Sequence, residues 1–255
     1  MKNFITTSQH GGTPVDLLRT KKSRGFYLIL GGLLWLFALV LWWQQQIDAD
    51  VLFGFNAARI TNTTLITLSQ WLSSYGMAAI TSLIVFYRLA SLKFQSLEAP
   101  LSIYFYTICS FGLSDILGVL LKFVFNRPRP ITTYGNEIIV YSQSATPSIP
   151  SGHATKSIAL ILPFLVLIST SKNQHKIFKI IITMIAGGVC FSRMVLGAHY
   201  FSDVLAGIGT AFIGLPLSML FANMVLRKTK QEQLFKLSMV WTILLIFLTV
   251  ILTIL

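Results

Sequence analysis

The sequence contains a small group of polar residues inside an apolar stretch, "CFSRMVLGAHYFSDVLAG" at residues 190–207. Arg193, His199 and Asp203 stand there in a chain of which only 11% is charged. Asp203 follows His199 by four residues, so the two side chains share a face if a helix has begun. A carboxylate on one imidazole nitrogen fixes the tautomer and makes the other nitrogen a better nucleophile. The spacing therefore predicts a nucleophilic His199 oriented by Asp203.

A second feature is fixed positive charge suited to an anion. It comes from Lys122 and Arg129 in "KFVFNRPRP", residues 122–130, and from Arg193. A guanidinium matches two phosphate oxygens with parallel hydrogen bonds. These three residues are therefore predicted to bind a phosphate group and to stabilise the charge that develops on it.

The third feature is "PSGH", residues 150–153. Ser151 and Gly152 precede a predicted helix start, so a hydroxyl and exposed backbone N–H groups can face an anion there. His153 supplies a second imidazole that is free to protonate a departing oxygen. Nucleophile, orienting carboxylate, acid and anion clamp together predict phosphoryl transfer to histidine and then hydrolysis. We expect no metal and no cofactor, because two histidines flanked by arginines and without a carboxylate cluster suit a dication poorly.

Membrane-spanning helices must position these residues. The chain is 54% hydrophobic with a mean hydropathy of +0.72, which excludes an ordinary soluble domain. Its apolar runs are continuous and not alternating, so they favour helices over a β-barrel. The predicted fold class is an all-α integral membrane helical bundle. Seven spans are predicted, at 26–43, 72–90, 101–121, 155–170, 178–196, 204–226 and 236–255.

The net charge of +12 is explained by membrane topology. With the basic N-terminus in the cytoplasm, fourteen of the twenty Lys and Arg residues fall in cytoplasmic segments. This bias predicts a multi-pass protein of the bacterial cell inner (cytoplasmic) membrane, with its N-terminus cytoplasmic and all three polar stretches at the outer, periplasmic face. We therefore expect the lipid bilayer as a partner and no nucleic acid, and the sequence makes no prediction of oligomeric state.

The chain is predicted to hold one domain. Residues 1–24 are expected to form a basic cytoplasmic tail, and residues 25–255 a single membrane-embedded domain whose motif-bearing core is 101–226. The segment 47–70 is predicted to form an interfacial helix on the outer side. The segment 123–153 contains four prolines and is predicted to be a turn-rich outer loop.

The three polar stretches, in this order, resemble the type 2 phosphatidic acid phosphatase (PAP2) superfamily. The matching residues are Lys122, Arg129 and Pro130 of Lys-x6-Arg-Pro, then Pro150, Ser151, Gly152 and His153, then Ser192, Arg193, His199 and Asp203 of Ser-Arg-x5-His-x3-Asp. The resemblance implies a six-helix phosphatase core, to which the segment 236–255 adds an extra C-terminal span. It implies His199 as the nucleophile, Asp203 as its partner and His153 as the general acid. It also implies phosphate binding by Lys122, Arg129, Ser151, Gly152 and Arg193.

The motifs predict an integral-membrane lipid phosphatase, acting on a phosphomonoester or diphosphate headgroup. Phosphatidylglycerophosphate, undecaprenyl diphosphate, phosphatidate and a phosphate of lipid A all carry the group that the motifs would bind. A lipid-to-lipid phosphotransferase would use the same covalent intermediate. The alternative from a different class is a non-enzymatic anion transporter or scaffold, which needs no nucleophile.

Three further polar residues have two interpretations each. Asp115, seven residues before Lys122, is either part of the site or, as we favour, a structural ion pair deeper in the membrane. Arg127 is a second phosphate ligand or, as we favour, a surface or lipid-headgroup contact. Lys156, three residues after His153, either touches the lipid headgroup or is a plain interfacial lysine.

Overall fold

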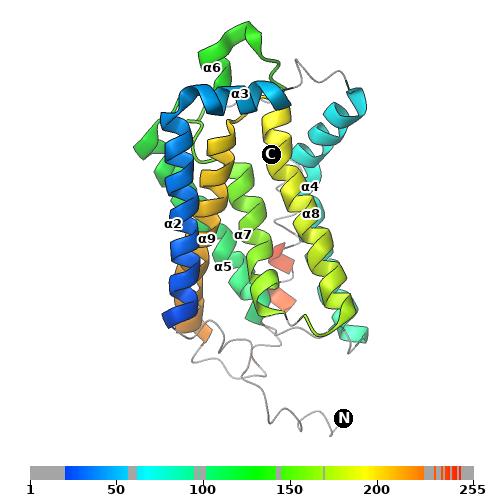
Figure 1. The fold of residues 1–255 in the computed structure, drawn as a ribbon. Helices are drawn as coiled ribbons and strands as arrows, with labels where there is room; N and C mark the ends of the chain where they lie inside the picture. Colours follow the sequence, from blue (N-terminus) through cyan, green and yellow to red (C-terminus); the bar gives the residue numbers. More distant parts are fainter. Residues whose placement is uncertain are drawn as a thin grey trace, which may run out of the picture.

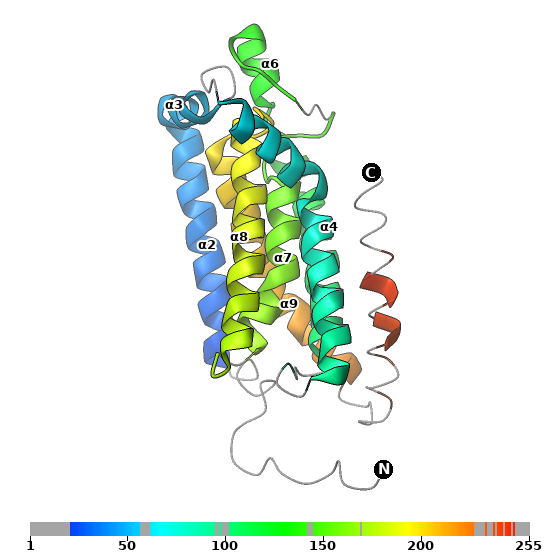
Figure 2. The same ribbon diagram turned by 90° about the vertical axis from the view of Figure 1, so that its right-hand side faces the viewer.

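The computed structural model describes residues 21–56, 62–94, 97, 102–141, 145–168 and 170–226, with single positions between 233 and 247. Within this part of the chain every regular element is a helix (Figure 1). The long helices run side by side and form one bundle, as the two views in Figures 1 and 2 show. This confirms the predicted all-α class.

In the described part of the chain, six long helices make up the bundle. They are α2 (Lys21–Trp43), α4 (Thr63–Lys93), α5 (Ser102–Phe125), α7 (Gly152–Leu167), α8 (Asn173–Val195) and α9 (Phe201–Leu226). Five of them are long and apolar enough to cross a membrane, and α7 is a shorter apolar helix with Pro163 inside it. The predicted six-helix core is thus present.

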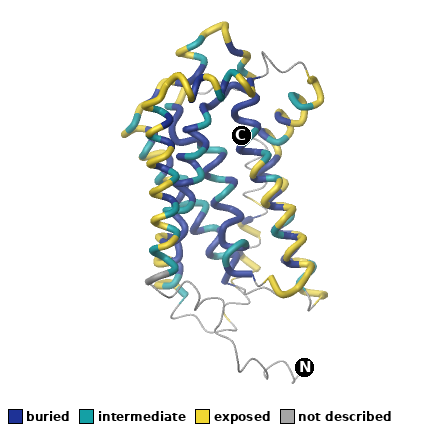
Figure 3. The backbone as a smooth tube through the Cα atoms, viewed as in Figure 1, coloured by how far each residue is buried: buried dark blue, intermediate teal, exposed yellow. Residues whose placement is uncertain are grey.

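The bundle has an apolar interior and an apolar exterior. Ile80, Tyr104 and Phe164 are almost completely buried in the main core. Large apolar side chains such as Phe86 and Met184 are exposed on the outward faces, and Figure 3 shows these faces along the bundle helices. Helices that are apolar all round belong in a membrane or a large core, so the bundle is built for a lipid environment.

Three short helices lie at one end of the bundle, which we call the site end. α3 (Gln45–Phe55) lies across it, and α6 (Pro130–Tyr134) and the 3-10 helix η2 (Gly135–Glu137) lie beside it (Figure 1). α6 begins with Pro130 at its first turn, where a missing N–H costs nothing. At this end α5 and α8 finish and α7 and α9 begin.

The sequence placed several boundaries differently. The sequence predicts one interfacial helix over residues 47–70, but α3 ends at Phe55 and residues 63–70 belong to α4. The start of α4 is capped by Asn62, whose side chain accepts a hydrogen bond from the Leu65 N–H at 3.1 Å. The tail was expected to end at residue 24, but α2 begins at Lys21. Hydropathy alone misses polar residues at helix starts, so most of the predicted spans begin later than the helices do. The rest of the predicted tail, residues 1–20, lies outside the described residues.

The predicted seventh span, 236–255, lies largely outside the described residues. The positions that are described between 237 and 247 are helical. Trp241 stacks on Phe105 of α5 at a centroid distance of 4.7 Å. For the remaining residues the span stays a prediction.

Candidate active site

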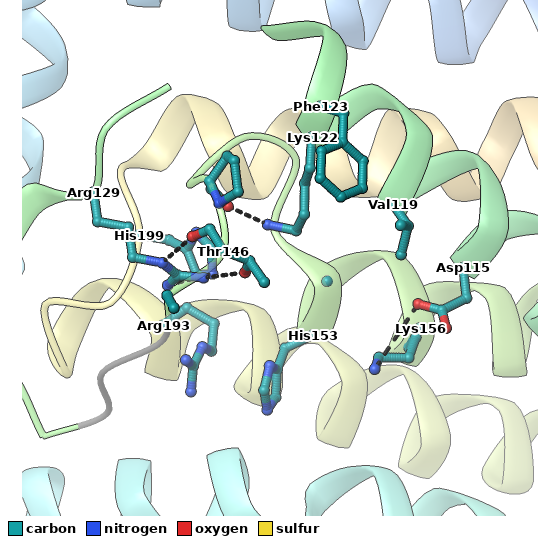
Figure 4. Close-up of a pocket in the computed structure, with 13 residues that line it drawn as sticks. Asp115, Val119, Lys122, Phe123, Arg129, Thr146, His153, Lys156, Arg193 and His199 are labelled. Carbon is teal, nitrogen blue, oxygen red and sulfur yellow. Dashed lines mark hydrogen bonds and ion pairs between the residues drawn. The ribbon is translucent and has the colours of Figure 1, made fainter. Parts of the chain in front are cut away.

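The three motif-bearing segments meet at the site end around one cavity of about 470 Å³. The predicted residues that line it are Lys122, Arg129, Gly152, His153, Arg193 and His199, together with Asp115 and Lys156 (Figure 4). Of the residues lining the cavity, four are cationic and one is a carboxylate. The arrangement therefore suits an anion, as the sequence predicted.

His199 lies on a tight turn between α8 and α9. Gly197 within this turn has φ +67°, a conformation that favours glycine. A Cβ at this position would come within 2.5 Å of the Ile139 carbonyl oxygen. The turn folds back on α8, because the N–H groups of Ala198 and His199 both donate to the Arg193 carbonyl, at 3.0 and 3.2 Å. The turn thus fixes the backbone position from which the His199 side chain extends.

The neighbours of the His199 ring select its tautomer. Nδ1 lies 3.4 Å from Oδ2 of Asp203, which can only accept, so Nδ1 carries the hydrogen. Nε2 faces Nη1 of Arg129 at 3.5 Å, and a guanidinium can only donate. Burial, together with the charges of Arg193 and Arg129, lowers the pKa of His199 from 6.5 to about 3, against an opposing effect of Asp203. The ring is therefore neutral, with its Nε2 lone pair at the cavity.

Asp203 both orients His199 and caps α9. It stands in the first turn of α9, and its Oδ2 accepts from the backbone N–H of Tyr200, which precedes the helix, at 3.0 Å. Oδ2 also accepts from the hydroxyl of Ser148. The carboxylate is completely buried, so these contacts hold it in one orientation. The spacing in the sequence predicts the orienting role, and the geometry adds the capping role.

The three predicted cations approach the cavity from different elements. Lys122, in the last turn of α5, donates to the Pro147 carbonyl. Arg129 donates from Nε to the Thr146 carbonyl at 2.8 Å and from Nη1 to the Ala198 carbonyl at 3.1 Å. Arg193 donates to the hydroxyl of Ser73 on α4. These backbone and hydroxyl contacts hold the long side chains in place at the cavity.

The start of α7 brings two backbone N–H groups to the cavity. Gly152 and His153 are the first two residues of α7, whose N–H groups have no partner within the helix, and both line the cavity. α9 approaches closely here, since a Cβ on Gly207 would lie 2.6 Å from the Ser151 carbonyl oxygen. Ser151 itself is fully buried, does not line the cavity, and its Oγ has no hydrogen-bond partner in the described part of the chain. Its predicted contact with phosphate stays a prediction.

The interpretation of Arg127 as a surface or lipid-headgroup contact is wrong. Its side chain is only 5% exposed and lies between two carboxylates. Nη1 donates to Asp203 at 2.7 Å, and Nη2 donates to Asp48 of α3 at 2.8 Å. Its guanidinium also lies 3.8 Å from the ring centre of Tyr200. Arg127 does not line the cavity, so it holds the orienting carboxylate instead of the phosphate.

Asp48 was missed by the sequence reasoning. It is 1% exposed, and its Oδ1 accepts from the Ser202 N–H at 3.1 Å, in the first turn of α9. Its Oδ2 accepts from the Ser202 hydroxyl and from Arg127. The Asp203 contact from Ser148 was missed as well. An acidic residue in the first turn of a weakly amphipathic helix, "QQIDAD", is the only signal for Asp48 in the sequence.

Asp115 and Lys156 form the ion pair that the structural interpretation of Asp115 required. Lys156 Nζ lies 3.9 Å from Asp115 Oδ1. The pair is not internal, however, because both residues line the cavity and their side chains are 27% (Lys156) and 39% (Asp115) exposed. Among the described residues, no group of three or more His, Cys, Asp or Glu side chains is placed to hold a metal ion. That the reaction needs no metal stays a prediction.

Comparison with known proteins also identifies the segment that contains the three motifs. Residues 101–227 match the family model of the PAP2 superfamily, and all three motifs lie inside that range. An undecaprenyl-diphosphatase from Sulfolobus acidocaldarius is 25% identical over 172 residues, which cover 64% of this chain and 74% of that protein.

Among solved structures, the chain is similar to a crystal structure described as the first transmembrane PAP2-type phosphatidylglycerolphosphate phosphatase from Bacillus subtilis. The TM-score is 0.50 at 24% identity, covering 86% of this chain and 98% of that chain. At this identity the likeness concerns the fold, and it extends well beyond residues 101–227.

Proposed function

Because this chain belongs to the PAP2 superfamily, a family of phosphatases with membrane lipid phosphatases among its relatives, we propose that it hydrolyses a phosphomonoester or diphosphate headgroup of a membrane lipid. Catalysis proceeds through a phosphohistidine on His199. The cationic cavity supports the proposal, since it joins an anion site to the exposed apolar side chains of Val119 and Phe123 on its wall. A lipid headgroup can bind at the cations while its tails lie against these side chains.

In the first step the Nε2 lone pair of His199 attacks phosphorus, and the bond from phosphorus to the leaving oxygen breaks. Burial and the charges of Arg193 and His199 lower the pKa of His153 well below 6.5, so His153 takes up its proton when the phosphate anion binds beside it and then gives that proton to the leaving oxygen. Asp203 accepts the Nδ1–H and stabilises the positive charge that the ring acquires. Lys122, Arg129 and Arg193 and the N–H groups at the start of α7 compensate the charge on the phosphoryl oxygens.

In the second step a water molecule attacks phosphorus and the bond to Nε2 breaks. His153, now neutral, takes a proton from the water, which returns both histidines to their starting states. The products are inorganic phosphate and the lipid that has lost it, which in the case of a diphosphate is a lipid monophosphate. No step requires a group that the chain does not supply.

We further propose that the reaction takes place at the periplasmic face of a bacterial inner membrane, with the N-terminus cytoplasmic. The proposal follows from the charge bias, which assigns fourteen of the twenty Lys and Arg residues to cytoplasmic segments. Labelling of introduced cysteines by an impermeant thiol reagent tests the orientation. A cysteine in α6 that is labelled in intact spheroplasts supports it, and protection there contradicts it.

The observation that carries the proposal is the placement of the His199 ring in the cavity wall, with Nδ1 beside Asp203 and Nε2 beside Arg129. The test is phosphate release by the purified protein from a panel of lipid phosphates in mixed micelles. His199→Ala should abolish release, and His10→Ala, in the N-terminal segment, serves as the histidine control. Brief reaction with a labelled lipid should leave acid-labile phosphate on the wild-type protein. Undiminished release by His199→Ala would exclude the mechanism.

A further inference from the structure

The chemistry proposed above uses one end of the cavity and leaves the other unassigned. At the unassigned end Lys156 and Asp115 face each other across the cavity wall, beyond His153 (Figure 4). Charged side chains at membrane depth cost free energy, and they commonly mark a functional site. We call this pair, Lys156 and Asp115, the distal pair.

The distal pair lies deeper in the bundle than the reacting groups. α7 begins at the site end, so Lys156 lies about 4.5 Å farther along its axis than His153. α5 finishes at the site end, so Asp115 lies about 10 Å deeper than Lys122. The cavity thus runs from His199, past His153, to the distal pair.

The distal pair is open enough to bind a ligand. Its closest N–O distance of 3.9 Å is long for an ion pair that exists to hold helices together, and both side chains are partly exposed at the cavity. An ammonium group has three donors, so one long contact with a carboxylate leaves capacity for ligand oxygens. Asp115 offsets the cost of an isolated ammonium at this depth.

The order of groups along the cavity indicates what binds there. His199 takes the phosphoryl group, His153 protonates the leaving oxygen, and the next part of the leaving molecule extends toward Lys156. Resting on the function proposed above, we propose that the distal pair is a subsite for a second phosphate, carried by the leaving molecule. The leaving molecule of a lipid diphosphate is a phosphomonoester, and that of phosphatidylglycerophosphate contains a phosphodiester. The diacylglycerol that leaves from phosphatidate is neutral and makes no ion pair with Lys156.

The test compares kcat/KM for three substrates in mixed micelles of the same detergent. Phosphatidylglycerophosphate and phosphatidate with identical acyl chains form a matched pair, and farnesyl diphosphate separates a diphosphate from a phosphodiester as the source of the second anion. Lys156→Met removes the cation at similar volume. We expect kcat/KM for at least one two-phosphate substrate to fall about 10- to 100-fold more than kcat/KM for phosphatidate. Equal losses for all three substrates would overturn the proposal.

A double variant separates a lost cation from an uncovered anion. Lys156→Met leaves Asp115 without its partner, and that carboxylate would itself repel a second phosphate. Lys156→Met with Asp115→Asn removes both charges and should show the same selective loss. Recovery of wild-type selectivity in the double variant would mean that Lys156 binds no phosphate. Lys156→Arg should retain the selectivity, and Lys176→Met, at the exposed start of α8, is the matched lysine control.

The failure of this inference differs from the failure of the proposed function. If His199→Ala still releases phosphate, or the wild-type protein releases none from any of the three substrates, the function itself is wrong. If His199→Ala is inactive and Lys156→Met lowers kcat/KM equally for every substrate, the function stands and the second-phosphate subsite does not.

Discussion

Asp48 tests whether helix α3 belongs to the catalytic machinery. Its two carboxylate oxygens accept from the Arg127 guanidinium at 2.8 Å, from the Ser202 N–H at 3.1 Å and from the Ser202 hydroxyl. In Asp48→Asn one of these oxygens becomes an NH2 group, which meets donors in either orientation. Arg127 and Asp48 are 5% and 1% exposed, so solvent does not compensate the change. Removing one charge of such a buried pair costs about 3–5 kcal/mol.

The catalytic consequence follows from the other side of Arg127. Its Nη1 donates to Asp203 at 2.7 Å. If the Asp48→Asn substitution lets the Arg127 side chain move, the carboxylate of Asp203 that contacts His199 moves with it. A displacement of about 1 Å at a reacting group can lower kcat by about 10²-fold. We expect a loss of up to this size in Asp48→Asn. KM should change little, because the cations that we propose to bind phosphate are untouched.

The assay is phosphate release well below the melting temperature of each variant, with thermal unfolding in the same detergent measured in parallel. Asp50→Asn is the matched control, because Asp50 is exposed on the same helix. Within the described part of the chain, its side chain accepts one hydrogen bond, from Gln46 at 3.0 Å. It should stay within about 0.5 kcal/mol of the wild-type protein. A folded Asp48→Asn protein with wild-type kcat would refute the positioning role, whatever its melting temperature.

Four further outcomes are expected. Asp203→Asn presents a donor to Nδ1 of His199 and so favours the wrong tautomer; kcat should fall by about 10²-fold or more, and equal kcat would contradict the tautomer assignment. The pKa of His199 is lowered to about 3 from 6.5, so its contribution to stability is fully present above pH 6.5 and is lost as pH falls toward 3, by about 2 kcal/mol at pH 5. Between pH 7 and pH 5 the melting temperature of His199→Ala should therefore fall less than that of the wild-type protein, and an equal fall would contradict the low pKa of His199. Gly197→Ala should lower the melting temperature, because a Cβ would lie 2.5 Å from a backbone carbonyl oxygen, whereas Gly187→Ala in open space on α8 should not; similar melting temperatures would contradict the turn geometry. EDTA should leave phosphate release unchanged, and inhibition that Mg²⁺ reverses would establish a metal requirement.

The motif residues could be predicted because their chemistry is local. His199 and Asp203 are four residues apart, and Lys122, Arg129 and Arg193 are rare cations in an apolar chain. Their charge made each of them visible. The spacing of four residues predicted the contact of His199 with Asp203, although His199 precedes α9 and meets Asp203 from the turn and not from the helix. The cavity confirms that the three segments converge.

The role of Arg127 could not be predicted, because it depends on contacts distant in the sequence. Its partners Asp48 and Asp203 are 79 and 76 residues away. From the sequence, an arginine between an asparagine and a proline after a span looks solvated or lipid-facing. Burial against the rings of Tyr200 and Trp42 excludes that environment, and tertiary packing alone produces it.

The same contacts show that the region matching the family does not hold the carboxylate of Asp203 unaided. Residues 101–227 include Arg127 and Asp203, but the second anion that fixes Arg127 comes from α3, and one of the two rings against its guanidinium comes from α2. Without Asp48, the Ser202 N–H at the start of α9 would also lose its acceptor. A buried arginine pairs well with one carboxylate, yet its remaining donors need partners to stay in place. The helices before residue 101 therefore belong to the catalytic unit of the proposed mechanism, because they complete the set of contacts that orients Asp203 and, through it, His199.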